Sequence, residues 1–157
     1  MTDAHLGQRP ETLLITLTGT DRPGVTSAVF TALSSAGVEV LDIEQIVLRG
    51  RLILGVLVTQ PRNAQRIVEA VQTTASALGM SVDVDHGVGD NKARGEGRSH
   101  VTVIGTPLKA AGMAAVAGRI ADSGANIDRI ERMARYPVTA IDLPVSGADT
   151  ATLRSVL

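Results

Sequence analysis

The chain has 157 residues and a net charge of −1, and 44% of its residues are hydrophobic. This apolar content is sufficient for a packed core and argues against disorder. A nearly neutral chain with one Phe, one Tyr and no Trp offers neither a basic field nor an aromatic platform for nucleic acid. The absence of Cys excludes disulfides, a thiol nucleophile and thiolate metal sites.

The sequence pattern also predicts neither a membrane-spanning helix nor a signal peptide. The longest apolar stretch, residues 52–58, is far shorter than the roughly 20 residues that a membrane helix needs. Residues 1–10 lack the apolar core of a signal peptide and are interpreted as a leader. We therefore expect a cytoplasmic protein with no nucleic-acid or membrane partner.

The first predicted elements are a strand at residues 13–18 and a helix that follows a loop containing glycine and proline. Apolar residues recur at helical spacing between Val25 and Ala36. Gly37 then occupies a position where glycine commonly ends a helix.

Two β-rich runs follow, at residues 38–48 and 51–59, and the two residues between them include a glycine. This spacing predicts a hairpin. The alternation of apolar residues slips after Val40, and a β-bulge would account for the slip. A second apolar stripe over residues 67–78 predicts a helix, and residues 81–85 alternate like a final strand. The predicted order is β-α-β-β-α-β, in a domain covering residues 11–86.

Residues 87–98 have almost no apolar content and are interpreted as a linker. The pattern then restarts in a second domain, residues 99–157. A strand at residues 100–104 is followed by a loop and by a helical stripe over residues 113–121.

The second domain continues with predicted strands at residues 126–134 and 138–145, and Asp149 is a plausible N-cap for a last helix. No final strand follows that helix. We therefore expect this copy to be incomplete, as in a fragment of a longer protein. The edge of the strand at residues 100–104 would then be open, which is a known route to association.

Internal similarity supports a duplication. Residues 36–44 align with residues 123–131, and the strand-end glycines Gly19 and Gly105 precede the glycines of these segments, Gly37 and Gly124, by 18 and 19 residues. Such a repeat indicates two copies of one structural unit.

Residues 19–25, after a strand and opening a helix, resemble the ligand loop of ACT domains. With the stretches 37–49 and 51–58, the two units are similar to the N-terminal region of actinobacterial phosphoserine phosphatases. The resemblance covers residues 11–157. It implies an α/β fold (an α+β sandwich) of two ferredoxin-like βαββαβ ACT domains, the second truncated before its last strand.

In that family, a C-terminal haloacid-dehalogenase phosphatase domain follows, which uses Mg²⁺ and an Asp nucleophile. The ACT pair binds amino acids, serine in particular, and helps to form a dimer. In this chain we predict no catalytic residues, because the nearest match to the nucleophile motif, residues 83–87, has Gly in place of Thr or Val. We expect no cofactor for the segment itself, and the three scattered histidines lack the spacing of a metal site.

The candidate ligand loop consists of Asp21, Arg22, Pro23, Gly24 and Val25. A helix start offers unpaired N–H groups and a partial positive charge, which favour a carboxylate. Gly24 would allow close approach to the backbone, and Asp21 could take the ammonium of an amino acid. The alternative is that Asp21 is simply the helix N-cap, in which case its carboxylate occupies the amides that a ligand needs.

The second copy lacks the Asp and the Pro-Gly pair of this loop. It carries Asn126 and Ile127 at the start of its second strand. Since sites in ACT proteins often lie between units, these two residues are candidates for contact with the first-repeat loop of a partner. An ordinary turn role for Asn126 is equally open.

The leading hypothesis is a serine-binding, homodimeric regulatory region of a phosphoserine phosphatase in L-serine biosynthesis, not catalytic by itself. One alternative is a stand-alone tandem ACT regulator resembling the glycine-cleavage repressor. The other is a dimerisation scaffold that binds no ligand.

Overall fold

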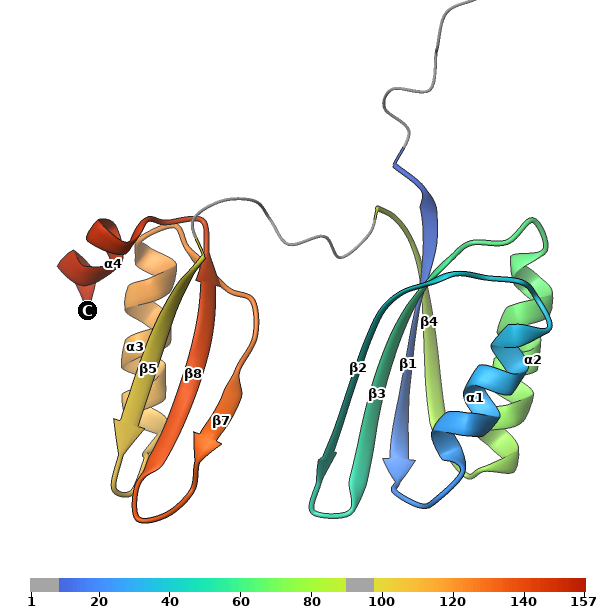
Figure 1. The fold of residues 1–157 in the computed structure, drawn as a ribbon, viewed down its shortest axis with the longest axis horizontal. Coiled ribbons are helices and arrows are strands. Elements are labelled where there is room, and N and C mark those ends of the chain that lie inside the picture. Colours follow the sequence, from blue (N-terminus) through green and yellow to red (C-terminus); the bar gives the residue numbers. More distant parts are fainter. Residues whose placement is uncertain (1–8, 90–97) are drawn as a thin grey trace, which may run out of the picture. The chain divides into compact units, whose positions relative to one another are not determined.

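The structure is a computed structural model that describes residues 9–89 and 98–157 (Figure 1). It divides into two compact units, Met1–Lys92 and Ala93–Leu157. Each unit is described by itself below.

The first unit is a four-stranded antiparallel sheet with two helices on one face (Figure 1). Its strand order is β2-β3-β1-β4, so the first and third strands of the chain lie in the middle. The predicted β-α-β-β-α-β order is confirmed. The elements are β1 (Glu11–Thr20), α1 (Val25–Ser34), β2 (Val40–Leu48), β3 (Arg51–Thr59), α2 (Ala64–Ala77) and β4 (Ser81–Val88).

Alternation along β1 creates the core of this unit. Leu13, Ile15 and Leu17 are fully buried on the helix-facing side, whereas Leu14 is 41% exposed on the other side. The helices cover the buried side with one apolar stripe each, including Val29 of α1. The end of β1 and the start of α1 are thereby fixed by the packing of the helices against the sheet.

The β2–β3 hairpin has the predicted two-residue turn. Arg49 and Gly50 both have positive φ, 51° and 76°, as a type I′ turn requires. The register shifts between Val40 and Asp42, which confirms the bulge.

The predicted linker begins too early. β4 continues to Val88, because β1 starts at Glu11 and the two residues are paired. The Thr12 hydroxyl also donates to the Gly89 carbonyl at 3.0 Å. Backbone pairing therefore extends through a stretch whose composition is typical of a linker. Residues 90–97 of the predicted linker and residues 1–8 of the leader lie outside the described residues.

The second unit also has a four-stranded sheet in its described part, but two of its strands, β6 and β7, are short and pair with the same neighbour. β8 is central, with β5 on one side and β6 and β7 on the other. A smaller core forms around Ile120, Leu143, Val145 and Leu153. The elements are β5 (Ser99–Gly105), α3 (Ala110–Asp122), β6 (Asn126–Ile127), β7 (Glu131–Ala134), β8 (Thr139–Ser146) and α4 (Thr150–Val156).

The strand predicted at residues 126–134 is broken into β6 and β7, so this prediction was wrong in its continuity. Asp128 lies between them and accepts hydrogen bonds from the Ser146 hydroxyl at 2.8 Å and from the Asn126 amide at 3.1 Å. Short polar side chains that bond locally compete with the strand ladder. A register shift between Arg132 and Ala134 further interrupts β7.

The open edge expected on β5 is present in the described part of the chain, where β5 pairs with β8 alone. The Pro144 carbonyl on β8 accepts from the Asp128 N–H at 2.9 Å, so the backbone groups of Pro144 point away from β5. His100, which is opposite Pro144, therefore turns its own N–H and C=O toward the open edge, as does Thr102 two residues later.

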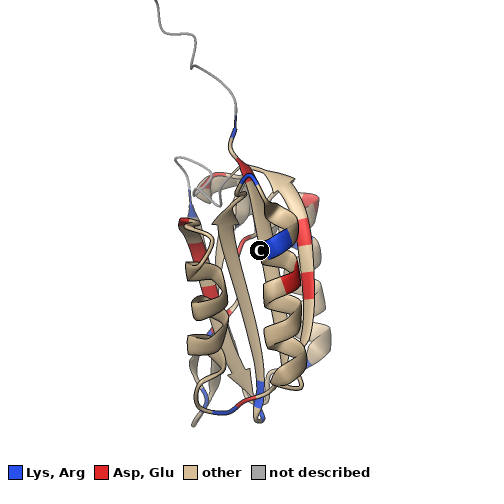
Figure 2. Cartoon of the chain, turned by 90° about the vertical axis from the view of Figure 1, so that its right-hand side faces the viewer, with Lys and Arg blue, Asp and Glu red and all other residues tan. Residues whose placement is uncertain are grey.

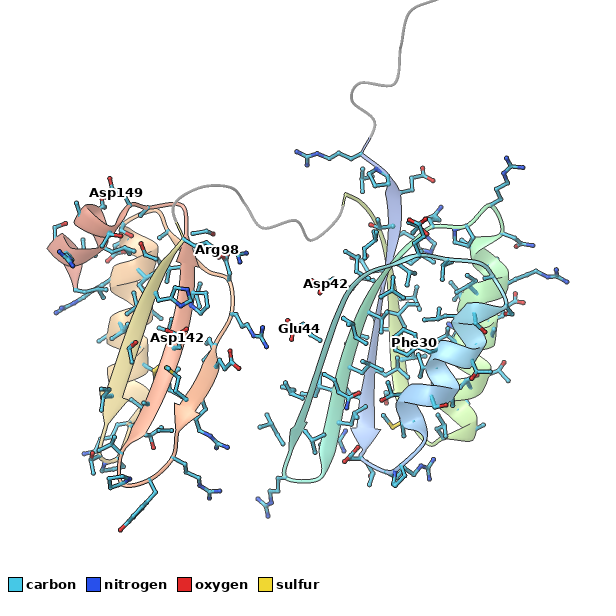
Figure 3. The ribbon with its side chains drawn as sticks, viewed as in Figure 1. Phe30, Asp42, Glu44, Arg98, Asp142 and Asp149 are labelled. Atoms are coloured by element: carbon cyan, nitrogen blue, oxygen red, sulfur yellow. The ribbon has the colours of Figure 1, made fainter. Side chains whose placement is uncertain are left out.

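Asp149 caps α4 as predicted (Figure 3). Its carboxylate accepts from the Thr152 backbone N–H at 2.7 Å. This bond, with a further one from the Thr152 hydroxyl, holds the pKa of the Asp149 carboxyl below its ordinary value.

Candidate ligand-binding site

The candidate site lies in the loop that connects β1 to α1. Gly24 is the N-cap residue of α1 and has φ 93° and ψ −10°, a left-handed conformation that L side chains rarely adopt. No atom lies within 4 Å of the position that a Cβ of Gly24 would occupy. The space on the Cβ side of Gly24 is therefore open.

The first-turn amides of α1 lack a cap. No side chain bonds to them, and the first bond at this end is from the Ala28 N–H to the Gly24 carbonyl at 3.0 Å. Among the described residues, no partner is found for the amides of Val25, Thr26 and Ser27. Three N–H groups at the positive end of the helix dipole are thus available to an acceptor.

Asp21 does not cap α1, so the alternative in which its carboxylate occupies the helix-start amides is not observed. Its backbone N–H instead donates to the Gly50 carbonyl at 2.8 Å, in the turn of the β2–β3 hairpin. Its side chain is exposed. The carboxylate therefore leaves the amides at the helix start unoccupied.

Arg22 serves a structural purpose in this conformation. Its guanidinium donates to the carbonyl of Leu78, the C-cap residue of α2. Together with the bond from Asp21 to Gly50, this contact ties the loop to two other elements. Val25 is buried and anchors the loop in the core, while Pro23 is exposed.

Two polar residues beside the loop were missed by sequence reasoning. The Thr26 hydroxyl, in the first turn of α1, donates to the Gln45 side-chain carbonyl on β2 at 2.7 Å. The only sequence signal was a Gln between Ile43 and Val47 in an otherwise apolar alternation. That signal does not identify its partner on the helix.

Asn126 and Ile127 lie in the second unit. The Asn126 amide donates to the Ile127 carbonyl at 3.2 Å and to Asp128 at 3.1 Å, so it is engaged in its own turn. Ile127 packs against the core of the second unit. Asn126 is exposed and keeps a carbonyl oxygen that can accept.

Two hollows lie elsewhere on the first unit. A hollow of about 390 Å³ lies on the sheet face opposite the helices, and Asp42 and Glu44 extend from β2 on that side (Figure 3). Its lining also includes Gly55 of β3. A second, of about 650 Å³, lies between the end of α1 and the start of α2 and includes Arg62. Neither of these two hollows includes residues 21–25.

Charged residues of both signs are distributed over strands and helices (Figure 2). Within residues 9–89 and 98–157, no three His, Asp or Glu side chains are grouped so that they could hold a metal ion. No helix in the same ranges has the length and apolar character needed to cross a membrane.

Curated relatives match most of this chain. It is 49% identical over 148 residues to the phosphoserine phosphatase of Streptomyces coelicolor, an alignment covering 93% of this chain and 36% of that protein. It is 40% identical over 137 residues to the phosphoserine phosphatase of Mycobacterium tuberculosis, covering 85% and 34%. The chain thus spans about a third of the length of these relatives.

Solved structures show the same fold. A protein described as a glycine cleavage system transcriptional repressor superposes with a TM-score of 0.69 and 17% identity, covering 92% of this chain and 87% of that one. A structure described as an unknown protein from Galdieria sulphuraria gives a TM-score of 0.67 and 19% identity, covering 86% of this chain and 81% of that one. At these identities the likeness shows the fold alone.

Family models described as ACT domain match residues 11–85 and residues 98–157. Both repeats are therefore matched independently, one in each unit of the structure. The chain belongs to the ACT-domain family and carries two such domains in tandem.

Proposed function

We propose that this chain is the serine-sensing and dimerisation region of a phosphoserine phosphatase that acts in L-serine biosynthesis in the cytoplasm. The identity of 49% to one such phosphatase supports the parent activity, and the two ACT domains support a regulatory role. The Mg²⁺ of such a reaction is proposed to belong with the phosphatase domain that the resemblance implies for the parent protein.

The observation that carries the sensor role is the uncapped start of α1. An amino acid presents a carboxylate and an ammonium on one carbon. The amides of Val25, Thr26 and Ser27 can hold the carboxylate, as helix starts commonly hold anions. The exposed carboxylate of Asp21 stands on the same loop and can take the ammonium.

The loop is also held in place before any ligand arrives. Asp21 is tied to the hairpin turn, Arg22 to the end of α2, and Val25 is buried in the core. Binding therefore needs little ordering of the backbone, which favours affinity for a small ligand. Asn126 and Ile127 are proposed to face the first-repeat loop of a partner chain.

Titration calorimetry with L-serine tests this function. The unmodified chain should bind serine, and Asp21→Ala should weaken binding about tenfold or more because the ammonium loses its charged partner. Glu69→Ala, an exposed acid on α2, is the matched control and should leave the affinity unchanged. Absence of heat with the unmodified chain, or equal affinity in Asp21→Ala, would refute the assignment.

A further inference from the structure

Gln45 is a polar residue in a row of apolar ones. On β2, the positions that pair with the buried residues of β3 face the helices, and they are Ile43, Gln45 and Val47. All three side chains are exposed, so an amide is accommodated at this position. What distinguishes Gln45 is the partner that it has on α1.

The geometry links Gln45 to the start of α1. Its side-chain carbonyl accepts from the Thr26 hydroxyl at 2.7 Å, which joins a strand to the first helical turn across 19 positions of sequence. In the described part of the chain, neither side chain has another hydrogen bond. The Gln45 amide keeps two N–H donors, and the Thr26 oxygen keeps its acceptor capacity.

The pair stands beside the proposed carboxylate site. The backbone N–H of Thr26 is one of the three uncapped amides, and its hydroxyl belongs to the same residue. A ligand carboxylate on these amides would place the ligand's side chain near the Thr26 residue, whose hydroxyl is bonded to Gln45. The pair combines donors with an acceptor, which is the complement of a hydroxyl group.

We propose that Gln45 and Thr26 are specificity-determining residues that recognise the side-chain hydroxyl of the bound amino acid. This inference rests on the proposed function, and it names the ligand class as small β-hydroxy amino acids. Polar groups positioned for a hydroxyl lose their partner when an analogue lacks it, so the site discriminates against alanine. The backbone amides and Asp21 bind the carboxylate and the ammonium that all amino acids share, and the Thr26–Gln45 pair recognises the side chain, which differs between them.

The test compares L-serine with L-alanine by titration calorimetry on the full chain. The unmodified protein should bind serine about tenfold more tightly than alanine. Gln45→Leu should weaken serine binding about tenfold and leave alanine binding unchanged. Thr26→Val keeps the shape of the side chain and should have the same effect. The double variant should be no worse than either single one, because the two residues act as a unit.

Gln65→Leu is the matched control, because Gln65 is an exposed glutamine whose amide donates to Glu69 of the same helix, α2. It should preserve the preference for serine. An equal loss for serine and alanine in Gln45→Leu, or an unchanged preference, would overturn this inference while leaving the proposed function intact. If the unmodified chain bound neither amino acid, the proposed function would fail and this inference with it.

Discussion

Replacing Gly24 by alanine should have two measurable effects, a loss of stability from backbone strain and a loss of affinity for the ligand. The residue has φ 93°, and the left-handed region costs an L residue about 1–2 kcal/mol. The reduced freedom of the unfolded chain offsets about 0.4–1 kcal/mol of this. Since no atom lies within 4 Å of the new Cβ, no steric clash adds to the sum. We expect the free energy of unfolding of the first unit to fall by about 1 kcal/mol.

The same methyl group stands in the space proposed for the ligand carboxylate, so Gly24→Ala should weaken serine binding at least tenfold. Gly37→Ala is the control, because Gly37 lies at the other end of α1 with φ 62° and equally open surroundings. It should lower stability similarly and leave the affinity unchanged. Stability is measured by urea unfolding with amide exchange in peptides from residues 11–88, and affinity by calorimetry. Unchanged serine affinity in Gly24→Ala would refute the reasoning.

Three further predictions concern packing, pH and the open edge. Gly19→Ala should destabilise the first unit by about 1–3 kcal/mol, because the new Cβ would meet the Met80 sulfur. Gly55→Ala is the control, because its Cβ has open space, and it should not destabilise the unit. Thermal unfolding of the two variants distinguishes these outcomes. Asp149→Ala should reduce the helicity of α4 at neutral pH. Because folding lowers the pKa of this carboxyl, its contribution is present above the ordinary aspartate value and lost as pH falls through the folded one, where circular dichroism of the two proteins should converge. If β5 edges pair in a homodimer, Thr102→Pro removes an outward N–H and should yield monomers in light scattering; an unchanged mass would place the interface elsewhere.

Hydrophobic periodicity was sufficient to predict most of the fold. The stripe from Val25 to Ala36 became α1 because its spacing specifies one buried face. The turn at Arg49 and Gly50 followed from a two-residue spacing that few backbone conformations can satisfy.

The predictions were wrong where strand pairing or side-chain hydrogen bonds, and not local composition, determine the structure. Val88 is in a strand because β1 offers Glu11 as its partner, which local composition does not reveal. The break at Asp128 depends on Ser146, which is 18 positions away. In the same way, the loop at residues 21–25 was visible as a motif, but the contact between Thr26 and Gln45 became visible only once the strand and the helix were placed together.

The central claim concerns three backbone amides, and nuclear magnetic resonance observes them individually. In a titration of the isotopically labelled chain with L-serine, the account predicts that the largest amide shifts occur at Val25, Thr26 and Ser27, with saturation. Shifts confined to the opposite sheet face around Gly55, with these three amides unmoved, would contradict it.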